Sequence, residues 1–316
     1  MHEIYVRDRK NNKNKNITKY VGDLSWTSDN DTLGVQLNFS VAYSDVNNFP
    51  KNLVEIGDIV ALKVDGKSIF VGVVLEVDIA GRDPRGVTCM DFGFYLNKND
   101  AIIQFNNVVA HTAIKRLLNK FGIAYSIDVM PVNITKIYKG EKVSDIIKDI
   151  FEIVETKTGV KYRMEMRNDV LFIMKQRDLV VTANTKYIIN PKRKLSIQDM
   201  KNSIHVVSDA ENVVKVSALA EDQNSIKKYG RLQMVHQVSD EEIASAKHTA
   251  NQLLKQYNKI FEENSVELIG NNNVRAGRIL KIVEPITGMN GNYLIKNVTH
   301  TVSGGVHMMS LNLEVS

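Results

Sequence analysis

The sequence predicts an α+β protein that is mainly β, in which two related β-barrel modules flank a small mixed α/β domain. Residues 54–62 and 274–282 each place a glycine before an apolar strand, and a second apolar strand follows each, at residues 69–74 and 293–298. The first third of the chain alternates apolar and polar residues, as strands do, whereas from about residue 103 the apolar residues recur with the period of a helix. A module used twice lets a ring contain twice as many modules as chains.

The N-terminal barrel module is predicted at residues 1–102. Between residues 35 and 41 every odd position is apolar and every even position polar, which suits an antiparallel strand with one wet face. Asp65-Gly66 is a strong hairpin signal, and residues 81–86 form the turn before a strand predicted at 87–96. Several short strands separated by turns are typical of a barrel or a sandwich.

The central domain is predicted at residues 103–180 and contains two units, each a helix followed by a strand. Gly122 and Gly159 stand where a left-handed cap ends each helix, and the residues after the two helices repeat the same pattern. Asn168-Asp169 then turns the second strand into a third, which gives two helices against a sheet. The apolar helix faces consist of Ala113, Ile114, Leu117, Leu118 and Phe121, and of Val143, Ile146, Ile147, Ile150, Ile153 and Val154.

The C-terminal barrel module is predicted at residues 181–316 and contains one long amphipathic helix, 240–262. Ser239 and Glu242 match a capping box, and an apolar stripe with helical spacing follows them. Two interpretations of the stripe remain open: it packs into the core of its own module, or part of it packs on a neighbouring subunit.

A last hairpin is predicted at Gly304-Gly305, leading into an alternating strand at 306–315 that would finish the second barrel. His300 and His307 flank this hairpin and could approach each other across it. Two histidines without a third ligand do not define a metal site.

Composition excludes several classes of protein. The chain has 316 residues, 43% of them apolar, and one cysteine, Cys89, which rules out an intrachain disulfide and suits folding in a reducing cytoplasm. The N-terminus lacks the order of a signal peptide and no apolar run reaches membrane-spanning length, so we expect no membrane insertion. A net charge of +5 permits contact with nucleic acid, but acidic residues are interleaved throughout, so we expect no sequence-specific nucleic-acid binding.

The densest basic stretch, residues 7–19, is predicted to be a solvated hairpin tip; the alternative is a phosphate-binding arm.

No motif for catalysis, cofactor binding or metal binding is present. The sequence contains neither a phosphate-binding glycine loop, nor a His-Glu-x-x-His pair, nor a Gly-x-Ser-x-Gly elbow. Cys89 lies in a strand-like run, where a buried thiol is expected rather than a nucleophile. Residues 137–147 are loosely similar to the opening of a LysM peptidoglycan-binding module, although any strand, turn and helix of a mixed domain has this pattern.

Three features occur in order along nearly the whole chain and together resemble one family. They are Ile56-Gly57-Asp58-x-Val60 with Phe70-x-Gly72-x-Val74, the central two-helix domain, and Val274-Arg275-x-Gly277 leading to Gly291-x-Tyr293-x-Ile295-x-x-Val298-x-His300. The chain resembles baseplate hub proteins of contractile phage tails, of the XkdQ/YqbQ type found in prophages and phage-tail-like bacteriocins, which are related to the late-control protein D group.

The resemblance implies a structural hub without a cofactor. Such a hub looks like a homotrimer whose two barrel modules per chain alternate in a pseudo-sixfold ring, with the tail tube protein, a threefold spike protein and other baseplate proteins as partners. It would be made in the bacterial cytoplasm and assembled into the tail. Glu55 and Asp58 of the first copy correspond to Arg275 and Arg278 of the second, and we predict that these opposite charges lie at or near the seams between barrels.

Two other functions remain as alternatives. A LysM-like module would bind peptidoglycan through residues 131–166, whereas a tail-associated cell-wall hydrolase would have a polar cleft that contains carboxylates or histidines. A defined trimer with an axial channel would favour the hub.

Overall fold

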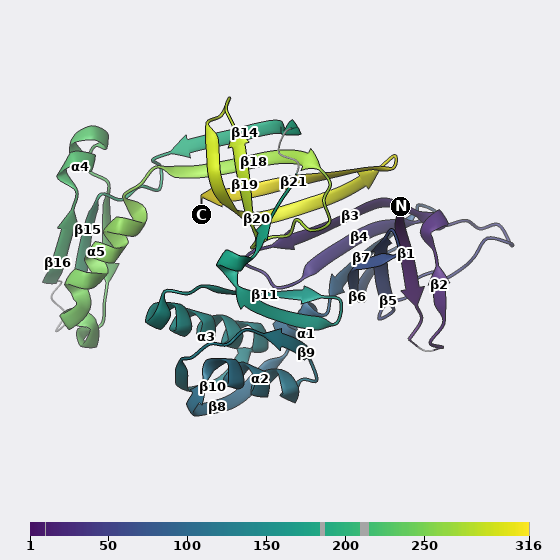
Figure 1. Cartoon of the computed structure of the whole chain (residues 1–316), viewed down its shortest axis with the longest axis horizontal. Coiled ribbons are helices and arrows are strands. Elements are labelled where there is room, and N and C mark those ends of the chain that lie inside the picture. The colour runs from purple at the N-terminus through teal and green to yellow at the C-terminus, as the bar shows by residue number, and fades with distance from the viewer. Residues whose placement is uncertain (10, 184–186, 209–214, 316) are drawn as a thin grey trace. The chain divides into compact units, whose positions relative to one another are not determined.

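The computed structural model describes residues 1–9, 11–183, 187–208 and 215–315 (Figure 1). The chain divides into two compact units, one made of residues 1–191 and 265–316, the other of residues 192–264. Most elements are strands, as expected. None of the helices in the described ranges is long and apolar enough to cross a bilayer.

Thirteen strands of the chain form one sheet, and two six-stranded parts of it have the same topology. The N-terminal half-sheet has the order β3-β4-β7-β6-β5-β1, and the C-terminal half-sheet the order β14-β18-β21-β20-β19-β13. If the strands of each are numbered along the chain, both orders are 2-3-6-5-4-1. The first strands differ in direction, because β1 is antiparallel to β5 whereas β13 is parallel to β19.

The bounds of these strands follow, together with those of β2, which pairs with β1, and of a short 3-10 helix, η1. N-terminal half-sheet: β1 His2–Arg7, β2 Asn14–Asn16, η1 Thr18–Tyr20, β3 Val21–Asp29, β4 Val35–Val41, β5 Ile59–Val64, β6 Lys67–Asp78 and β7 Arg85–Asp91. C-terminal half-sheet: β13 Val180–Val181, β14 Ile189–Ser196, β18 Phe261–Ile269, β19 Ile279–Glu284, β20 Met289–Ser303 and β21 Val306–Val315.

The turn before β5 and the turn before β19 have the same backbone hydrogen bonds. Gly57 N–H donates to Val74 O at 2.9 Å, and Gly277 N–H donates to Ile295 O at 2.7 Å. Both glycines have positive φ, 88° and 80°, which glycine adopts without a steric penalty.

The return bonds also match. Val74 N–H donates to Asp58 O and Ile295 N–H to Arg278 O, each at 2.9 Å. The sequence repeat is therefore a repeat of backbone structure.

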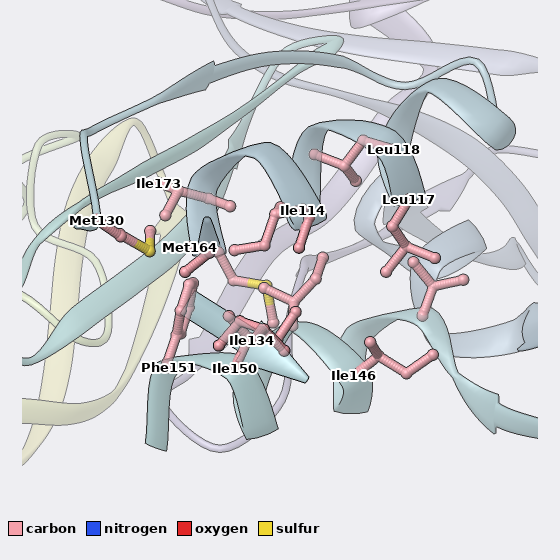
Figure 2. Packing of buried hydrophobic residues seen from close by; sticks show 14 of the residues in the cluster. Ile114, Leu117, Leu118, Met130, Ile134, Ile146, Ile150, Phe151, Met164 and Ile173 are labelled. Carbon is pink, nitrogen blue, oxygen red and sulfur yellow. The ribbon is translucent and has the colours of Figure 1, made fainter. Parts of the chain in front are cut away.

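The central domain follows β7 and forms a core of its own. Two helix-strand units are confirmed, α2 with β9 and α3 with β11, and Gly122 and Gly159 both have the left-handed φ of a helix cap. Figure 2 shows the packing, in which Ile114, Leu117 and Leu118 of α2 meet Ile146 and Ile150 of α3. The bounds are α1 Gly93–Lys98, β8 Asp100–Val109, α2 Ala110–Lys120, β9 Ala124–Ile127, β10 Asn133–Lys142, α3 Val143–Thr158, β11 Tyr162–Arg167, β12 Val170–Lys175 and η2 Gln176–Asp178.

The second unit is a sheet of three strands, β16-β15-β17, with helix α5 packed on it. Its core contains Ile204 and Val206 of the sheet and Ala246 and Ala250 of the helix. The apolar stripe of α5 thus packs within its own unit. The bounds are β15 Ser203–Ser208, β16 Lys215–Glu221, α4 Gln223–Tyr229, β17 Gln233–Gln237, η5 Asp240–Ser245 and α5 Ala246–Tyr257.

The predicted helix 240–262 was too long. Residues 240–245 form a 3-10 turn, the α-helix ends at Tyr257, and strand β18 begins at Phe261. Asn258 stops the helix, since its side chain donates to Asp222 at 2.7 Å. The predicted capping box therefore does not begin the helix, and the side chain of Glu242 lies outside the described residues.

The strand predicted at 87–96 was also too long, because β7 ends at Asp91. The buried Asp91 carboxylate accepts hydrogen bonds from Gly93 N–H at 2.9 Å and from Val35 N–H at 2.8 Å. This side chain turns the backbone out of the strand and into α1, as aspartate does in turns.

Three predicted hairpins are confirmed. Asp65-Gly66 joins β5 to β6, Gly304-Gly305 joins β20 to β21, and the basic stretch 7–19 lies at the hairpin of β1 and β2. Residue 10 in that last hairpin lies outside the described residues.

Candidate functional site

The two half-sheets meet where β3 pairs with β20, and two groups of polar residues surround this seam. The first group is a cluster of arginines around Glu165, which we call the arginine junction. It consists of Arg163, Glu165, Arg167, Arg275 and Arg278. The second is a group of histidines around Trp26.

Glu165 of β11 is the only carboxylate of the arginine junction. Arg278 donates to both of its oxygens, at 2.6 and 3.2 Å, and Arg167 donates a third bond. Burial by itself raises the pKa of Glu165, but the hydrogen bonds and charges of Arg278 and Arg167 outweigh it and hold the pKa below its usual value. A paired, fully hydrogen-bonded carboxylate can remain charged in the interior.

Arg275 ties three parts of the first unit together. Its guanidinium donates to Met166 O of β11 at 3.0 Å and to Ile69 O of β6 at 2.8 Å. Burial lowers its pKa, and the charge of Glu165 opposes that effect. Arg275 of the C-terminal half-sheet is thus hydrogen-bonded to both the central domain and the N-terminal half-sheet.

Arg163 fastens the turn between β3 and β4. It donates to Asn30 O at 2.9 Å, to Asn30 Oδ1 at 2.7 Å and to Asp29 O at 3.3 Å. The middle of its side chain lies on Gly277, where a β-carbon would come within 1.6 Å of Nε. Glycine is required at this position both for its φ and for this close approach.

The arginine junction is filled by its own side chains. Only about 20 Å³ of cavity remains among Ser28, Asp91, Glu165 and Arg275, room for a single water molecule at most. The junction therefore joins strands and offers no space to a substrate.

The four residues predicted at the seams lie in two places. Arg275 and Arg278 lie in the arginine junction, whereas Glu55 and Asp58 lie in the equivalent turn before β5. Asp58 is buried and its carboxylate accepts from Glu55 N–H at 2.9 Å, and the Glu55 side chain is exposed.

Sequence reasoning missed Glu165 and Arg163 as members of this site. The signal that could have found them is the alternation of Arg163, Glu165 and Arg167 on one face of a predicted strand, because three charges on one face of a strand need partners when that face is buried.

The predicted approach of His300 and His307 is confirmed. His300 Nδ1 lies 3.0 Å from His307 Nε2, and His300 Nε2 lies 3.0 Å from Val274 O. Trp26, directly opposite His300 in the register of β3 and β20, stacks on the His300 ring at 4.8 Å between centroids. His2 lies edge-on to His307 at 5.0 Å.

Burial keeps these histidines neutral. It lowers the pKa of His300 to about 3 and that of His307 to about 4, and neighbouring positive charge adds to the effect. Among the residues whose positions are described, no group of three or more histidine, cysteine or acidic side chains is arranged to hold a metal ion. The histidine group is thus a packed, aromatic part of the seam.

Cys89 lies fully buried in β7 between β4 and β6. The expectation of a buried thiol is confirmed, and burial raises the pKa of that thiol.

Comparison with known proteins places the chain in a family. The model of the YQBQ-like family matches residues 24–314, which include the central domain, the second unit and all strands of the two half-sheets except β1 and the ends of β3 and β21. The chain belongs to the YQBQ-like family. One relative in Bacillus subtilis (strain 168), "Uncharacterized protein YqbQ", is 27% identical in an alignment of 277 residues that covers 82% of this chain and 82% of the relative.

Solved structures of tail proteins have a similar fold. A 43 kDa tail protein of prophage MuSo2 from Shewanella oneidensis is 12% identical and gives a TM-score of 0.70 over 100% of this chain and 98% of that one. The tail protein from Neisseria meningitidis MC58 is 13% identical and gives a TM-score of 0.67 over 99% and 96%. At these identities the likeness is one of fold.

Proposed function

We propose that this protein is the structural hub of a phage-tail baseplate. Three copies form a ring in which N-terminal and C-terminal barrel modules alternate, and this pseudo-sixfold ring joins a hexameric tail tube to a threefold spike. The half-sheets are the cores of the two barrel modules, residues 1–102 and 181–316, and residues 103–180 form the domain between them. The tail is a contractile tail of a phage or of a phage-tail-like bacteriocin.

The observation that carries this proposal is the shared strand order of the two half-sheets. A ring that is sixfold on one face and threefold on the other needs two modules with the same backbone and different surfaces. The equivalent turns meet this requirement, because they have the same hydrogen bonds but carry Glu55 and Asp58 in one and Arg275 and Arg278 in the other.

The family and the fold support the same role. The two structures above are titled as tail proteins. A third similar structure, the Escherichia coli c3393 protein, is titled as a component of the type VI secretion system with structural similarity to the T4 bacteriophage tail proteins gp27 and gp5, with a TM-score of 0.51 and 10% identity over 94% of this chain.

A structural role also fits the chemistry of the seam. The charged groups of the arginine junction are paired with one another and with backbone oxygens, and leave a cavity of only about 20 Å³. We therefore propose that the protein is not an enzyme and acts through shape, with the tail tube protein, the spike protein and other baseplate proteins as partners. It would be made in the bacterial cytoplasm and incorporated into the tail.

We propose that all four charged residues, Glu55, Asp58, Arg275 and Arg278, lie at or near seams between modules. Arg275 and Arg278 would act inside each chain, where they fasten its two modules, and Glu55 and Asp58 would lie beside the equivalent seam between copies. The opposite charges would then distinguish the two kinds of seam in the ring.

The test is the mass of the chain in solution together with electron microscopy of assembled tails. We expect a trimer that forms a ring with an axial channel, at the junction of tube and spike. A chain found outside the baseplate, or present there in a number that is not a multiple of three, would contradict the proposal.

One observation keeps the hydrolase alternative open. A cleft of about 310 Å³ is lined by Asp31, Glu152 and Glu155, together with Lys148 and Tyr162. Incubation of the purified chain with peptidoglycan separates the two functions: release of soluble fragments that is lost in Glu152→Gln would favour a hydrolase, and the hub predicts no release.

A further inference from the structure

One face of the N-terminal half-sheet is exposed, although its equivalent in the C-terminal half-sheet is covered. The equivalence of β6 and β20 rests on the shared turn bonds at Val74 and Ile295 and on a shared irregularity. Each strand slips in register against its neighbour directly after that residue, between Val74 and Glu76 and between Ile295 and Asn297. Ile79, five residues beyond Val74, therefore corresponds to His300, five residues beyond Ile295.

The covered face belongs to the C-terminal half-sheet. Val274, Ala276 and His300 are exposed to only 0%, 2% and 1%. Strand β3 covers them, since Trp26 stacks on His300 and Ser28 Oγ accepts from Ala276 N–H at 3.0 Å.

The equivalent positions of the N-terminal half-sheet are Val54, Ile56 and Ile79. Ile56 is 70% exposed and Ile79 is 62% exposed. With Val77 they line a pocket of about 430 Å³. We call Val54, Ile56, Val77 and Ile79 the open face. Two exposed isoleucines that correspond to a buried alanine and a buried histidine indicate a surface that is covered in an assembly.

The strand that corresponds to β3 is β14. It is the end strand of the sheet, so its outer edge has no strand partner within the described part of the chain. In the same sheet β6 lies seven positions away from β14, so each copy offers one unpaired strand edge at β14 and one open face beside β6. An unpaired edge favours pairing with another chain.

The charges of these two strands are complementary. Residues 192–194 of β14 are Lys, Arg and Lys; Arg193 and Lys194 pair with Glu262 and Glu263 of β18, and Lys192 is exposed. The end of β6 carries the exposed acids Glu76 and Asp78. Opposite charges on neighbouring strands stabilise a pair, so the exposed Lys192 of β14 suits the acidic end of β6.

We propose that β14 of a second copy of this chain pairs with residues 76–78 at the end of β6 and with Ile79 directly after it, and covers the open face. The contact would repeat between copies the contact that β3 makes with β20 within one copy. Because it joins different surfaces head to tail, it generates a ring when the rotation closes. The inference rests on the proposed function, since it supplies the contact between copies that the hub requires.

The first test uses Ile79→Asp, with Ile102→Asp as the matched control. Ile102 is a comparably exposed isoleucine, at 74%, on β8 of the central domain. Sedimentation of the full chain over a range of concentrations should show that Ile79→Asp raises the concentration of half-assembly by about tenfold or more, because a carboxylate would be buried in the contact. Ile102→Asp should assemble like the wild type, and both variants should keep the wild-type unfolding midpoint at a concentration where all three chains are monomers.

The second test is chemical cross-linking, which Cys89 does not disturb because it is buried. Chains with Ile79→Cys are mixed with chains with Lys192→Cys and treated with a short bismaleimide. Covalent pairs should form in the mixture and in neither chain alone. A mixture of Ile102→Cys and Lys192→Cys chains should give none.

The outcomes separate this inference from the hub role. If the wild type and Ile79→Asp assemble equally well and no cross-link forms, the pairing of β14 with β6 is overturned, and the hub stands with another contact between copies. If the wild type remains a monomer at every concentration, gives no cross-link and is absent from the baseplate of assembled tails, both are overturned.

Discussion

Arg163 lies on Gly277, so closely that a β-carbon at Gly277 would come within 1.6 Å of the Arg163 Nε atom. The arginine cannot move aside at low cost, because its guanidinium holds Asn30 and Asp29 of the turn after β3. This contact connects the turn before β19, the central domain and the N-terminal half-sheet.

We expect Gly277→Ala to destabilise the protein by about 3 kcal/mol, from backbone strain at φ +80° and from displacement of Arg163. Gly57→Ala is the matched control. Gly57 has φ +88° in the equivalent turn but no atom within 4 Å of its added β-carbon, so it should lose only about 1 kcal/mol. Urea unfolding of both variants measures the difference. Equal losses would mean that the contact with Arg163 contributes nothing.

Glu165→Gln should cost about 3 kcal/mol or more, because it leaves buried arginines without their carboxylate. The side chains of Glu165 and Arg278 are only 7% and 14% exposed. The control is Glu263→Gln, which breaks an exposed pair with Lys194 and should cost no more than about 0.5 kcal/mol.

The same carboxylate predicts a dependence on pH. The pKa of Glu165 is lower in the folded chain than its ordinary value of 4.5, so its contribution is complete above pH 4.5 and is lost as the pH falls below that value. Glu165→Gln should therefore flatten the loss of stability of the wild type below pH 4.5. A variant with an unchanged acid limb would contradict the charged state assigned to Glu165.

Local features of this fold could be predicted from the sequence, and those that depend on distant partners could not. The Asp65-Gly66 and Gly304-Gly305 hairpins are properties of two neighbouring residues, and the φ of Gly57 and Gly277 follows from their turns. The pairing of Arg278 with Glu165 joins residues 113 positions apart, and no local pattern specifies such a contact.

The end of the last helix illustrates a second limit. The apolar stripe after residue 246 continues with helical spacing to Phe261, but Phe261 pairs as part of β18 and Asn258 is held by Asp222. Spacing alone does not reveal where a tertiary contact interrupts a helix. The insertion of residues 197–260 between strands β14 and β18 of one sheet was unpredicted for the same reason.

The histidine group at the seam predicts that the folded chain loses stability already at pH values above those at which carboxylates titrate. Burial lowers the pKa of His300 from 6.5 to about 3, and His307, His2 and Arg275 face it with their own positive or ionisable groups. The unfolded chain takes up the proton first, so the stabilisation is complete above pH 6.5 and falls as the pH is lowered toward 3. For the buried His300 the loss between pH 6.5 and 5 is about 2 kcal/mol.

His300→Gln should therefore lose less stability between pH 7 and pH 5 than the wild type does, whatever its stability at pH 7. His248→Gln, on the exposed side of α5, is the control and should keep the wild-type slope. The measurement is urea unfolding at several pH values. Parallel curves for the wild type and His300→Gln would show that His300 does not titrate with unfolding.

The insertion between β14 and β18 should be removable. In the N-terminal half-sheet the equivalent strands, β3 and β4, are joined by residues 30–34 alone. The core of the insertion, formed by Ile204, Val206, Ala220, Val238, Ala246 and Ala250, lies entirely within residues 197–260. None of these residues belongs to the three other hydrophobic clusters of the described chain. Replacement of residues 197–260 by the five residues Asn-Asp-Thr-Leu-Gly of the β3–β4 turn should thus leave the rest of the chain folded.

The chain shortened in this way should unfold in a single transition, with a buried and unreactive Cys89 and with Trp26 fluorescence like that of the full chain. The bonds of Arg193 to Glu262 and of Lys194 to Glu263 lie outside the deleted segment and should keep β14 beside β18. A shortened chain with reactive Cys89 and solvent-exposed Trp26 would mean that the insertion is needed for folding of the half-sheets. The pair β14 and β18 would then not be equivalent to the pair β3 and β4, although the rest of the two half-sheets would be.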